Sequence, residues 1–260
     1  MKVFGKQTTR ANETFQSLRA GILSGTIPAG ARMRTNDLCV QFQVSLGAVR
    51  EALSQLLAQG LVVSEAHRGF TVSPVSTEDL VDLTRVRIQI ENLCLSWAIQ
   101  AGTVEWESTI IASVHRVSRT QRVGEHGRPS EEWTDAHNKF HLALLSTCDS
   151  PRLMQIRHQL YEQSERYRNL ELSLPLNRNP EAEHQRLAEA ALARDIPLAT
   201  RYMAEHLNLT ASNLLKSMPG GHHPAPRRPK PVPKRVGSVR PPTATRRRAA
   251  RPAGTSRSAK

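Results

Sequence analysis

The apolar positions of the first 75 residues predict three helices followed by two short strands. Phe15, Leu18 and Ile22 lie at helical spacing, and Gly25 is well placed to end that helix. After the turn-rich connection TIPAGARM, Asn36 can cap a short second helix. The inward positions of the second and third helices are Leu38, Cys39 and Phe42, then Ala48, Val49, Ala52, Leu53, Leu56 and Leu57. Each helix is therefore expected to bury one apolar side.

The third helix and the segment after it complete a pattern typical of DNA-binding domains. Ser45 can cap this helix, and Gly60 closes it. LVVS and FTVS then predict two short strands joined by EAHRG. Three helices followed by a basic hairpin describe a winged helix-turn-helix, in which the start of the third helix enters the major groove. We expect residues 1–75 to bind an operator in double-stranded DNA.

Two exposed segments of this domain are expected to contact the DNA. Ser45, Gly47 and Arg50 occupy the start of the third helix. Arg50 can reach a guanine edge or a phosphate, and only the guanine contact carries sequence information. The tip of the wing consists of His67, Arg68 and Gly69. The alternative for Arg50 is an ordinary solvated charge on a helix.

Residues 76–218 show helical periodicity throughout and contain no convincing strand. Ser76 or Thr77 can cap the first helix, in which Leu80, Leu83, Val86, Ile90, Leu93 and Trp97 recur near helical spacing. The predicted helices span 77–101, 104–121, 130–147, 151–172, 180–194 and 197–217. The short breaks between them fit helix connections. The sequence therefore predicts a mostly α protein, with a six-helix bundle after the winged helix-turn-helix.

The last two predicted helices fold back on each other at Arg194-Asp195-Ile196-Pro197. Pro197 fits the first turn of the second helix, where its missing N–H has no partner to lose. His184 lies eleven residues before Asp195, and His206 lies eleven after it. Equal distances from the turn of an antiparallel hairpin place two residues at the same height. The two imidazoles are therefore expected to lie level with each other.

A second pair of histidines lies in the third helix of the bundle. His137 and His141 are four residues apart, hence on one face and about one turn distant. Together with His184 and His206, they give four histidines able to converge inside the bundle. Imidazoles at fixed positions suit Zn²⁺, Ni²⁺ or Cu²⁺. The alternative is four separate histidines, each in its own core or surface environment.

Charge is distributed unevenly along the chain. The whole sequence has a formal net charge of +13, but residues 219–260 hold 12 Lys and Arg and no acidic residue. Without them, 24 Lys and Arg face 23 Asp and Glu. The segment is rich in Pro and Arg and poor in large apolar residues, so we expect a disordered tail. Such a tail can add sequence-independent attraction to phosphates or serve only as a solubilising extension.

Cysteine usage and the N-terminus predict a cytoplasmic protein. Cys39, Cys94 and Cys148 are scattered, and no CxxC pair occurs. The N-terminus lacks the apolar core of a signal peptide, and no run of about 18 apolar residues is present.

The first domain resembles the GntR family of transcription regulators over residues 12–75. The resemblance rests on LRAGILSGTIPAGARM, VSLGAVREALSQLLAQGLV and RGFTV, which occur in order. The family usually carries an arginine after the helix-capping Ser or Thr, and here that position is Leu46. Arg50 and Arg68, with Arg32 or Arg34, are therefore expected to supply more of the affinity for DNA.

Residues 77–217 resemble the FCD effector domain of the FadR-type branch of that family. Its metal-binding members use an Asp-x-x-x-His pair and two later histidines, which correspond here to His141, His184 and His206. His137 stands at the Asp position and completes an all-nitrogen set. Asp135 is turned roughly 120° away from His141 on the helix and is a poor substitute. The resemblance implies a divalent metal, with Zn²⁺ or Ni²⁺ expected.

The resemblance also implies a small carboxylate effector, bound by the metal and an arginine. Arg87 matches a recurrent arginine on the first helix of the FCD domain. It can fork onto a carboxylate, or it can pair with Glu91 four residues on as a surface couple. Other cationic candidates are Arg157, Arg166 and Arg168.

These features together predict a homodimeric, ligand-responsive repressor rather than an enzyme. A metal-ion sensor, in which the ion itself is the signal, is the first alternative. A metal-dependent hydrolase with a DNA-binding head would need an open coordination position and a general base, and no clear base is visible beside the histidines. A nucleic-acid compacting protein driven by the tail would bind without sequence preference.

Overall fold

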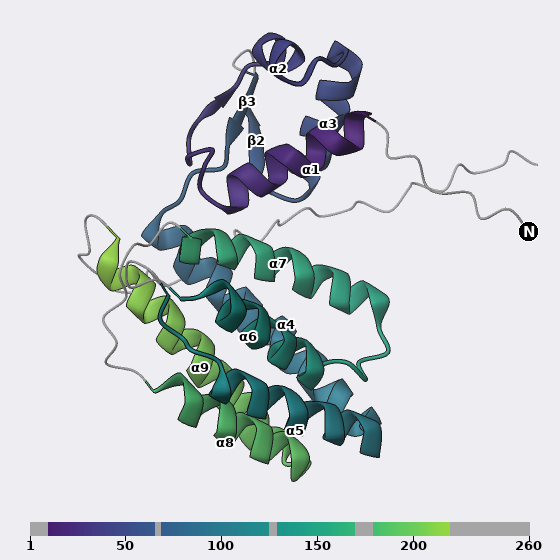
Figure 1. The fold of residues 1–260 in the computed structure, drawn as a ribbon, viewed down its shortest axis with the longest axis vertical. Coiled ribbons are helices and arrows are strands. Elements are labelled where there is room, and N and C mark those ends of the chain that lie inside the picture. The colour runs from purple at the N-terminus through teal and green to yellow at the C-terminus, as the bar shows by residue number, and fades with distance from the viewer. Residues whose placement is uncertain (1–9, 66–68, 125–128, 170–178, 219–260) are drawn as a thin grey trace, which may run out of the picture. The chain divides into compact units, whose positions relative to one another are not determined.

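The computed structural model describes residues 10–65, 69–124, 129–169 and 179–218, and the predicted disordered tail lies outside this part of the chain. The described residues form a head of three helices with a small sheet, followed by a bundle of six helices (Figure 1). The prediction of a winged helix-turn-helix followed by a helical domain is confirmed.

The head consists of helices packed on an antiparallel sheet. Its helices are α1 (Arg10–Leu23), α2 (Thr35–Phe42) and α3 (Leu46–Ala58), and its strands are β1 (Arg32–Met33), β2 (Val62–Glu65) and β3 (Gly69–Val72), in the order β1-β3-β2. Leu18, Ile22, Leu53 and Leu56 form the centre of the core. The sequence pattern did not indicate β1, because two residues carry no alternation.

The ends of the head's helices follow the predicted caps with one exception. The hydroxyl of Ser45 accepts a hydrogen bond from the Ala48 backbone N–H at 3.3 Å, and Gly60 follows α3 with φ +70°. The prediction that Asn36 caps α2 is wrong. The helix begins at Thr35 directly after β1, so Arg34 stands at the N-cap without a side-chain bond and Asn36 lies exposed in the first turn.

The bundle comprises the six predicted helices, and every end whose predicted position lies in the described residues falls within three residues of that position. The six helices are α4 (Thr77–Ala101), α5 (Val104–Arg119), α6 (Glu131–Leu144), α7 (Pro151–Asn169), α8 (Pro180–Leu192) and α9 (Ile196–Ser217). The predicted end of the fourth helix, residue 172, lies outside the described residues. Ser76, Thr103, Ser130, Asn179 and Asp195 each cap the helix that follows. No helix in the described residues is long and apolar enough to span a membrane.

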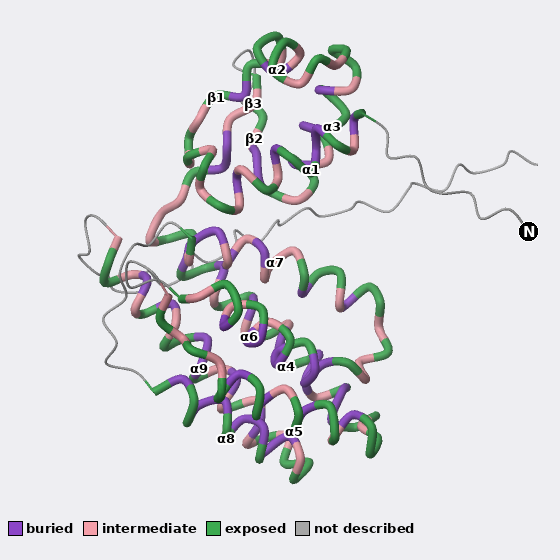
Figure 2. Tube along the Cα trace, in the orientation of Figure 1, coloured by how far each residue is buried: buried purple, intermediate pink, exposed green. Residues whose placement is uncertain are grey.

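The core of the bundle lies between α4 and the five later helices. Helix α4 packs against α7 and α9, while α5 packs against α6 and α8. Buried residues follow one side of each helix (Figure 2). Trp106, Phe140, Leu187 and Met203 lie at the centre of this core.

The apolar stripe predicted along α4 turns only partly inward. Leu80 and Leu83 are buried, but Val86, Leu93 and Trp97 are about two-fifths exposed, at 40%, 42% and 40%. The inward side is occupied instead by Arg87 and Glu91, followed by Cys94, Leu95, Ala98 and Ile99. The buried side of this part of α4 is therefore rotated about 100° from the predicted stripe, and it contains two charged residues.

Helix α7 contacts the head as well as the bundle. Gln163 donates a hydrogen bond to the carbonyl of Gln59 at 2.9 Å, and Asn169 donates to that of Leu23 at 2.8 Å. Arg166 donates to the carbonyl of Ser73, and Arg19 of α1 forms an ion pair with Glu162. Helix α7 thus contacts both the head and another helix of the bundle.

Candidate metal and effector site

Three helices bring the four predicted histidines together. His137 and His141 come from α6, His184 from α8 and His206 from α9, and all four are buried, with exposed fractions of 1–3%. One ring nitrogen of each lies within 4.8 Å of the others. The cluster therefore offers four nitrogen ligands to one ion.

The two halves of the cluster meet as the spacing predicts. The ring centroids of His184 and His206 are 4.9 Å apart across the α8–α9 hairpin, and those of His137 and His141 are 4.6 Å apart on α6. Arg194 closes the hairpin turn with φ +57°, and Asp195 caps α9 through the Leu198 N–H. The hairpin thereby holds two of the ligands at one level.

Asp135 takes no part in this cluster. It is exposed on α6 and forms an ion pair with Lys139 at 2.7 Å. His137 is instead the fourth member of the cluster, and its ring stacks on Trp133 at 4.8 Å between centroids. Imidazole therefore stands where relatives with an Asp-x-x-x-His pair would place a carboxylate.

A buried carboxylate orients one of the ligands. Glu183 Oε2 lies 2.9 Å from His206 Nδ1, and both side chains are buried. When Nδ1–H donates to this carboxylate, Nε2 is the nitrogen that carries the lone pair, which is the usual arrangement around metal-bound histidines. The sequence analysis did not single out Glu183. Its side chain lies on the buried side of α8, as does that of the adjacent His184.

The environment of His137 and His141 favours their neutral form. Burial lowers the pKa of His137 and of His141 well below the usual value of 6.5, and the neighbouring histidines add to this effect. Neutral imidazole is the form that binds a metal ion. His137 Nδ1 is buried without a hydrogen-bond partner among the described residues, and the Nε2 atoms of His137 and His141 lie 3.2 Å apart. The donor set fits a borderline divalent ion such as Zn²⁺ or Ni²⁺.

A second buried cluster contains more positive than negative charge. Glu91 accepts hydrogen bonds from Arg87 Nε at 3.3 Å and from Arg157 Nε at 3.1 Å, and all three side chains are buried. Arg87 Nη1 also donates to Ser164 at 2.7 Å, and the Tyr161 ring lies against both guanidinium groups. Arg87 does pair with Glu91, but inside the bundle and not as a surface couple.

One donor of this cluster remains unused within the described part of the chain. Arg157 Nη2 is buried and has no hydrogen-bond partner there. Both guanidinium groups lie near enough to His141 to help lower the pKa of its imidazole. Arg87 and Ser164 also line a cavity of about 10 Å³, which leaves room for about one water. An anion larger than water would therefore have to displace side chains of α4, α7 or α9.

Of the remaining cationic candidates, Arg166 is directed to the head, whereas Arg168 lies near enough to His137 and Arg87 to help lower the pKa of both groups. Arg166 bonds the Ser73 carbonyl, and Arg168 pairs with Glu165 at 2.9 Å. Among the three arginines of α7 that the sequence left open, Arg157 is the one that joins Glu91.

The predicted DNA-binding residues lie on the surface of the head. Ser45, Gly47 and Arg50 are exposed at the start of α3, with Leu46 between them. Arg32 is exposed on β1 opposite Thr71, and Arg34 is exposed before α2. Gly69 begins β3 with φ +79°. His67 and Arg68 lie outside the described residues, so their placement on the wing stays a prediction.

Two family models match successive parts of the chain. The model of the bacterial regulatory proteins of the gntR family matches residues 10–72, and the FCD domain model matches residues 82–209. The chain is 40% identical over 205 residues to the HTH-type transcriptional regulator BphR of Paraburkholderia xenovorans, covering 76% of this chain and 82% of BphR. It is 30% identical over 218 residues to the HTH-type transcriptional repressor GlaR of Escherichia coli, covering 82% and 99%.

Solved structures share the fold. Escherichia coli McbR/YncC aligns with a TM-score of 0.62 at 21% identity, covering 80% of this chain and 98% of that one. A GntR regulator from Rhodococcus sp. RHA1 aligns with the same TM-score and identity, covering 80% and 99%. The curated relatives named above are regulators of transcription and not enzymes, as predicted for this chain.

Proposed function

The chain belongs to the GntR family of DNA-binding transcription regulators and carries an FCD domain, and from this premise we propose that it is a repressor that senses a small carboxylate at a metal ion held by His137, His141, His184 and His206. The observation that carries the proposal is the convergence of four buried imidazoles within 4.8 Å. Four ring nitrogens gathered in one buried space suit a divalent ion, which can bond to all of them. When bound, the ion supplies positive charge that attracts a carboxylate oxygen.

The charge balance of the bundle favours an anionic effector. Arg87 and Arg157 share the single carboxylate of Glu91, so these three side chains together carry one net positive charge. Because His137 supplies the fourth donor, a divalent ion held by these four histidines would have no carboxylate ligand among them. A small carboxylate would offset both surpluses, and Nη2 of Arg157 offers it a donor.

Helix α7 offers a route from the effector to the DNA-binding head. On one side of α7, Arg157 bonds to Glu91 and Ser164 accepts a hydrogen bond from Arg87. Glu162 and Gln163 of the same helix contact the head. A carboxylate that displaces side chains around Arg157 would change the preferred position of α7. Repression is relieved if the effector binds more tightly to the position of α7 in which the head binds the operator less well.

The head is proposed to bind DNA through α3. Arg50 lies exposed at the start of this helix and is the residue there that can reach a guanine edge. Arg32, Arg34, Ser45 and Gly47, with His67, Arg68 and Gly69 of the wing, are proposed to contact the backbone or the groove. A homodimer would read two half-sites related by a two-fold axis.

The test measures operator affinity under three conditions. Fluorescence anisotropy with a fragment from upstream of the gene would be recorded with chelator, with Zn²⁺ or Ni²⁺, and with metal plus each of a panel of small mono- and dicarboxylates. The proposal expects one acid to weaken binding at least tenfold, in the presence of metal only. Equal affinity under all conditions and with all acids would contradict it.

A metal-ion sensor is the second candidate, and the small cavity favours it. Only about 10 Å³ is open beside Arg87, whereas the histidines are already assembled for an ion. In that case metal alone changes the operator affinity, and the acids add nothing.

A further inference from the structure

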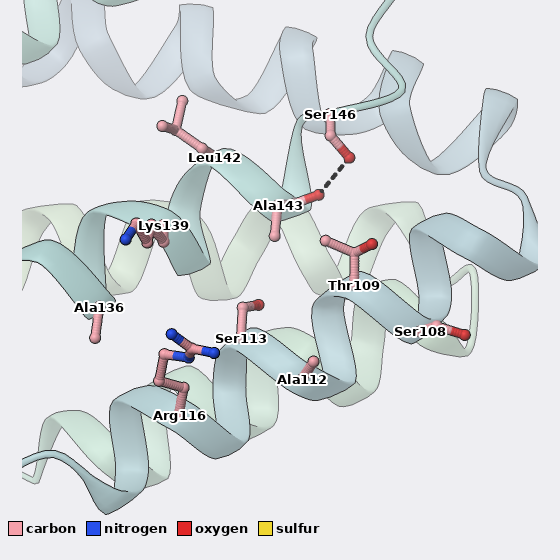
Figure 3. Close-up of a pocket in the computed structure, with 10 residues that line it drawn as sticks. All are labelled: Ser108, Thr109, Ala112, Ser113, Arg116, Ala136, Lys139, Leu142, Ala143 and Ser146. Atoms are coloured by element: carbon pink, nitrogen blue, oxygen red, sulfur yellow. Dashed lines mark hydrogen bonds between the residues drawn. The ribbon is translucent and has the colours of Figure 1, made fainter.

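The outward side of α5 and α6 forms an apolar surface with a groove. The groove has a volume of about 650 Å³ and runs between the two helices (Figure 3). It is lined by Ser108, Thr109, Ala112, Ser113 and Arg116 of α5, by Ala136, Lys139, Leu142 and Ala143 of α6, and by Ser146 just after α6. Leu142, which lines the groove, is 47% exposed. Val104 and Ile111, which are 70% and 56% exposed, lie about 40° and about 60° around α5 from the groove-lining Ser108 at 100° per residue. Exposed apolar side chains gathered on one face mark a surface that another protein covers.

Helix α5 also carries charge in a symmetric layout. Glu105 and Arg119 are both exposed, and Ala112 lies seven residues from each of them. At 100° per residue the three side chains fall within about 40° of one another, on the side next to the groove. Arg116 extends from the same helix toward α6 (Figure 3). An acidic start, a small centre and a basic end therefore share one side of α5.

We infer that this surface binds the α5–α6 surface of a second copy of the chain, with the two α5 helices antiparallel and crossing at Ala112. A two-fold axis through the crossing would place Glu105 of each copy opposite Arg119 of the other, about 10 Å from the centre at each end. Ala112 lets the backbones approach closely. Val104 and Ile111 of one copy then lie over the groove of the other.

The occupant is a second copy because the surface is complementary to itself. A contact about a two-fold axis requires a ridge and a groove on the same surface, together with charges that invert along it. The ridge of Val104 and Ile111, the adjacent groove and the Glu105-to-Arg119 polarity meet all three requirements. This inference rests on the proposed function in one respect, since it supplies the two heads that a two-fold operator needs.

Charge reversal tests the antiparallel crossing directly. Full-length protein, E105R and R119E would be examined by sedimentation velocity at low salt over a range of concentrations. The wild type is expected to be a dimer. Each single variant places two like-charged pairs at the interface, so its dimer dissociation constant should rise about tenfold or more.

An equimolar mixture of E105R and R119E restores both complementary pairs, and the dimer should return as a heterodimer. The double variant E105R/R119E should also dimerise.

Further variants distinguish this surface from a dimer built on another helix. A112W should dissociate the dimer whatever the salt, because the bulky ring blocks the crossing, whereas R152E, a matched reversal on exposed α7, should have no effect. L93R and W97R test the exposed side of α4 as a competing interface. A monomeric wild type, single variants that dimerise like wild type, a mixture that stays monomeric, or dissociation by the α4 variants alone would each overturn the inference.

The two proposals fail in different ways. A dimer that is unaffected by E105R and R119E refutes this interface, while operator binding and its response to acids remain as proposed. A dimer that behaves as inferred but shows no acid or metal response refutes the sensing function and leaves the interface intact.

Discussion

His184 and His206 lie eleven residues on either side of Asp195, and the α8–α9 hairpin brings their ring centroids to 4.9 Å. The turn fixes this relationship, since the left-handed backbone of Arg194 and the Asp195 cap set where α8 ends and α9 begins. The cluster therefore results from two local relationships: the i,i+4 spacing of the pair on α6, and the equal distances of His184 and His206 from the hairpin turn.

Replacing Glu183 should weaken metal binding without removing a ligand. E183Q keeps the size of the side chain but loses its charge, and E183L loses the hydrogen bond to His206 as well. We expect about tenfold and about 100-fold lower Zn²⁺ affinity respectively, as is usual for partners that orient a ligating histidine. Competition with a chromogenic chelator measures this affinity. Unchanged affinity in E183L would show that the carboxylate does not orient His206, and E189Q on the exposed side of α8 is the matched control.

Replacing Arg157 should separate effector binding from metal binding. R157M retains the aliphatic length of the side chain and leaves Glu91 paired with Arg87, so the free energy of unfolding should change little compared with the loss of Glu91. Calorimetry should show at least tenfold weaker binding of the active acid and normal metal content. Full acid affinity in R157M would exclude Arg157 from the effector site. R152M, exposed on the same helix, controls for the loss of an arginine.

The metal-free protein should lose stability as the pH falls through about 6.5. Burial holds the pKa of His137 and His141 well below 6.5 in the folded state. Just below that pH the unfolded chain binds protons that the folded chain does not, so protonation favours unfolding. Each histidine lowers the free energy of unfolding by up to about 1.4 kcal/mol per pH unit in that range.

Urea unfolding at pH 7.5, 6.5 and 5.5 with chelator present measures this slope. Saturating Zn²⁺ should raise the stability at pH 7.5, and this gain should shrink as protons compete for the imidazoles. The double variant H137F/H141F should show a shallower pH dependence. Equal stability of the metal-free wild type at the three pH values would contradict the assignment of neutral buried imidazoles.

Removing Arg50 should abolish sequence-specific DNA binding and leave the bundle unaffected. R50A loses a contact on the order of 1–3 kcal/mol per half-site, or about 2–6 kcal/mol in a dimer, which corresponds to about 30-fold or more in operator affinity. A mobility-shift titration against the operator and a scrambled duplex checks this. Metal content should equal that of the wild type. An unchanged preference for the operator would show that α3 docks differently, with Leu46 rather than Arg50 toward the bases.

Local signals predicted most of the fold. Side-chain caps such as Ser76 and the short breaks between helices located the bundle's helix ends within three residues wherever the predicted end lies in the described residues. The histidine cluster could also be predicted from the sequence, because helical spacing and a tight hairpin are local relationships. Asn36 failed as a cap because the chain enters α2 directly from β1, and a strand of two residues leaves no periodic signal.

Contacts between residues far apart in the sequence could not be predicted in this way. Glu91 and Arg157 are 66 residues apart, and only the packing of α4 against α7 shows that they meet. The same packing turns Arg87 and Glu91 inward and leaves Leu93 and Trp97 partly exposed, against the simple periodicity of α4. The carboxylate that orients His206 has the same origin, since Glu183 reaches it across the hairpin.

The most direct test of the central claim is metal content. Wild type and the double variant H184A/H206A would be purified in parallel and analysed by inductively coupled plasma mass spectrometry, with D135A as a control outside the cluster. We expect about one Zn²⁺ or Ni²⁺ per chain in wild type and D135A, and a loss of at least 100-fold in metal affinity in the double variant. Wild type that neither carries nor takes up a stoichiometric divalent ion, or a folded double variant that binds metal as wild type does, would contradict the claim.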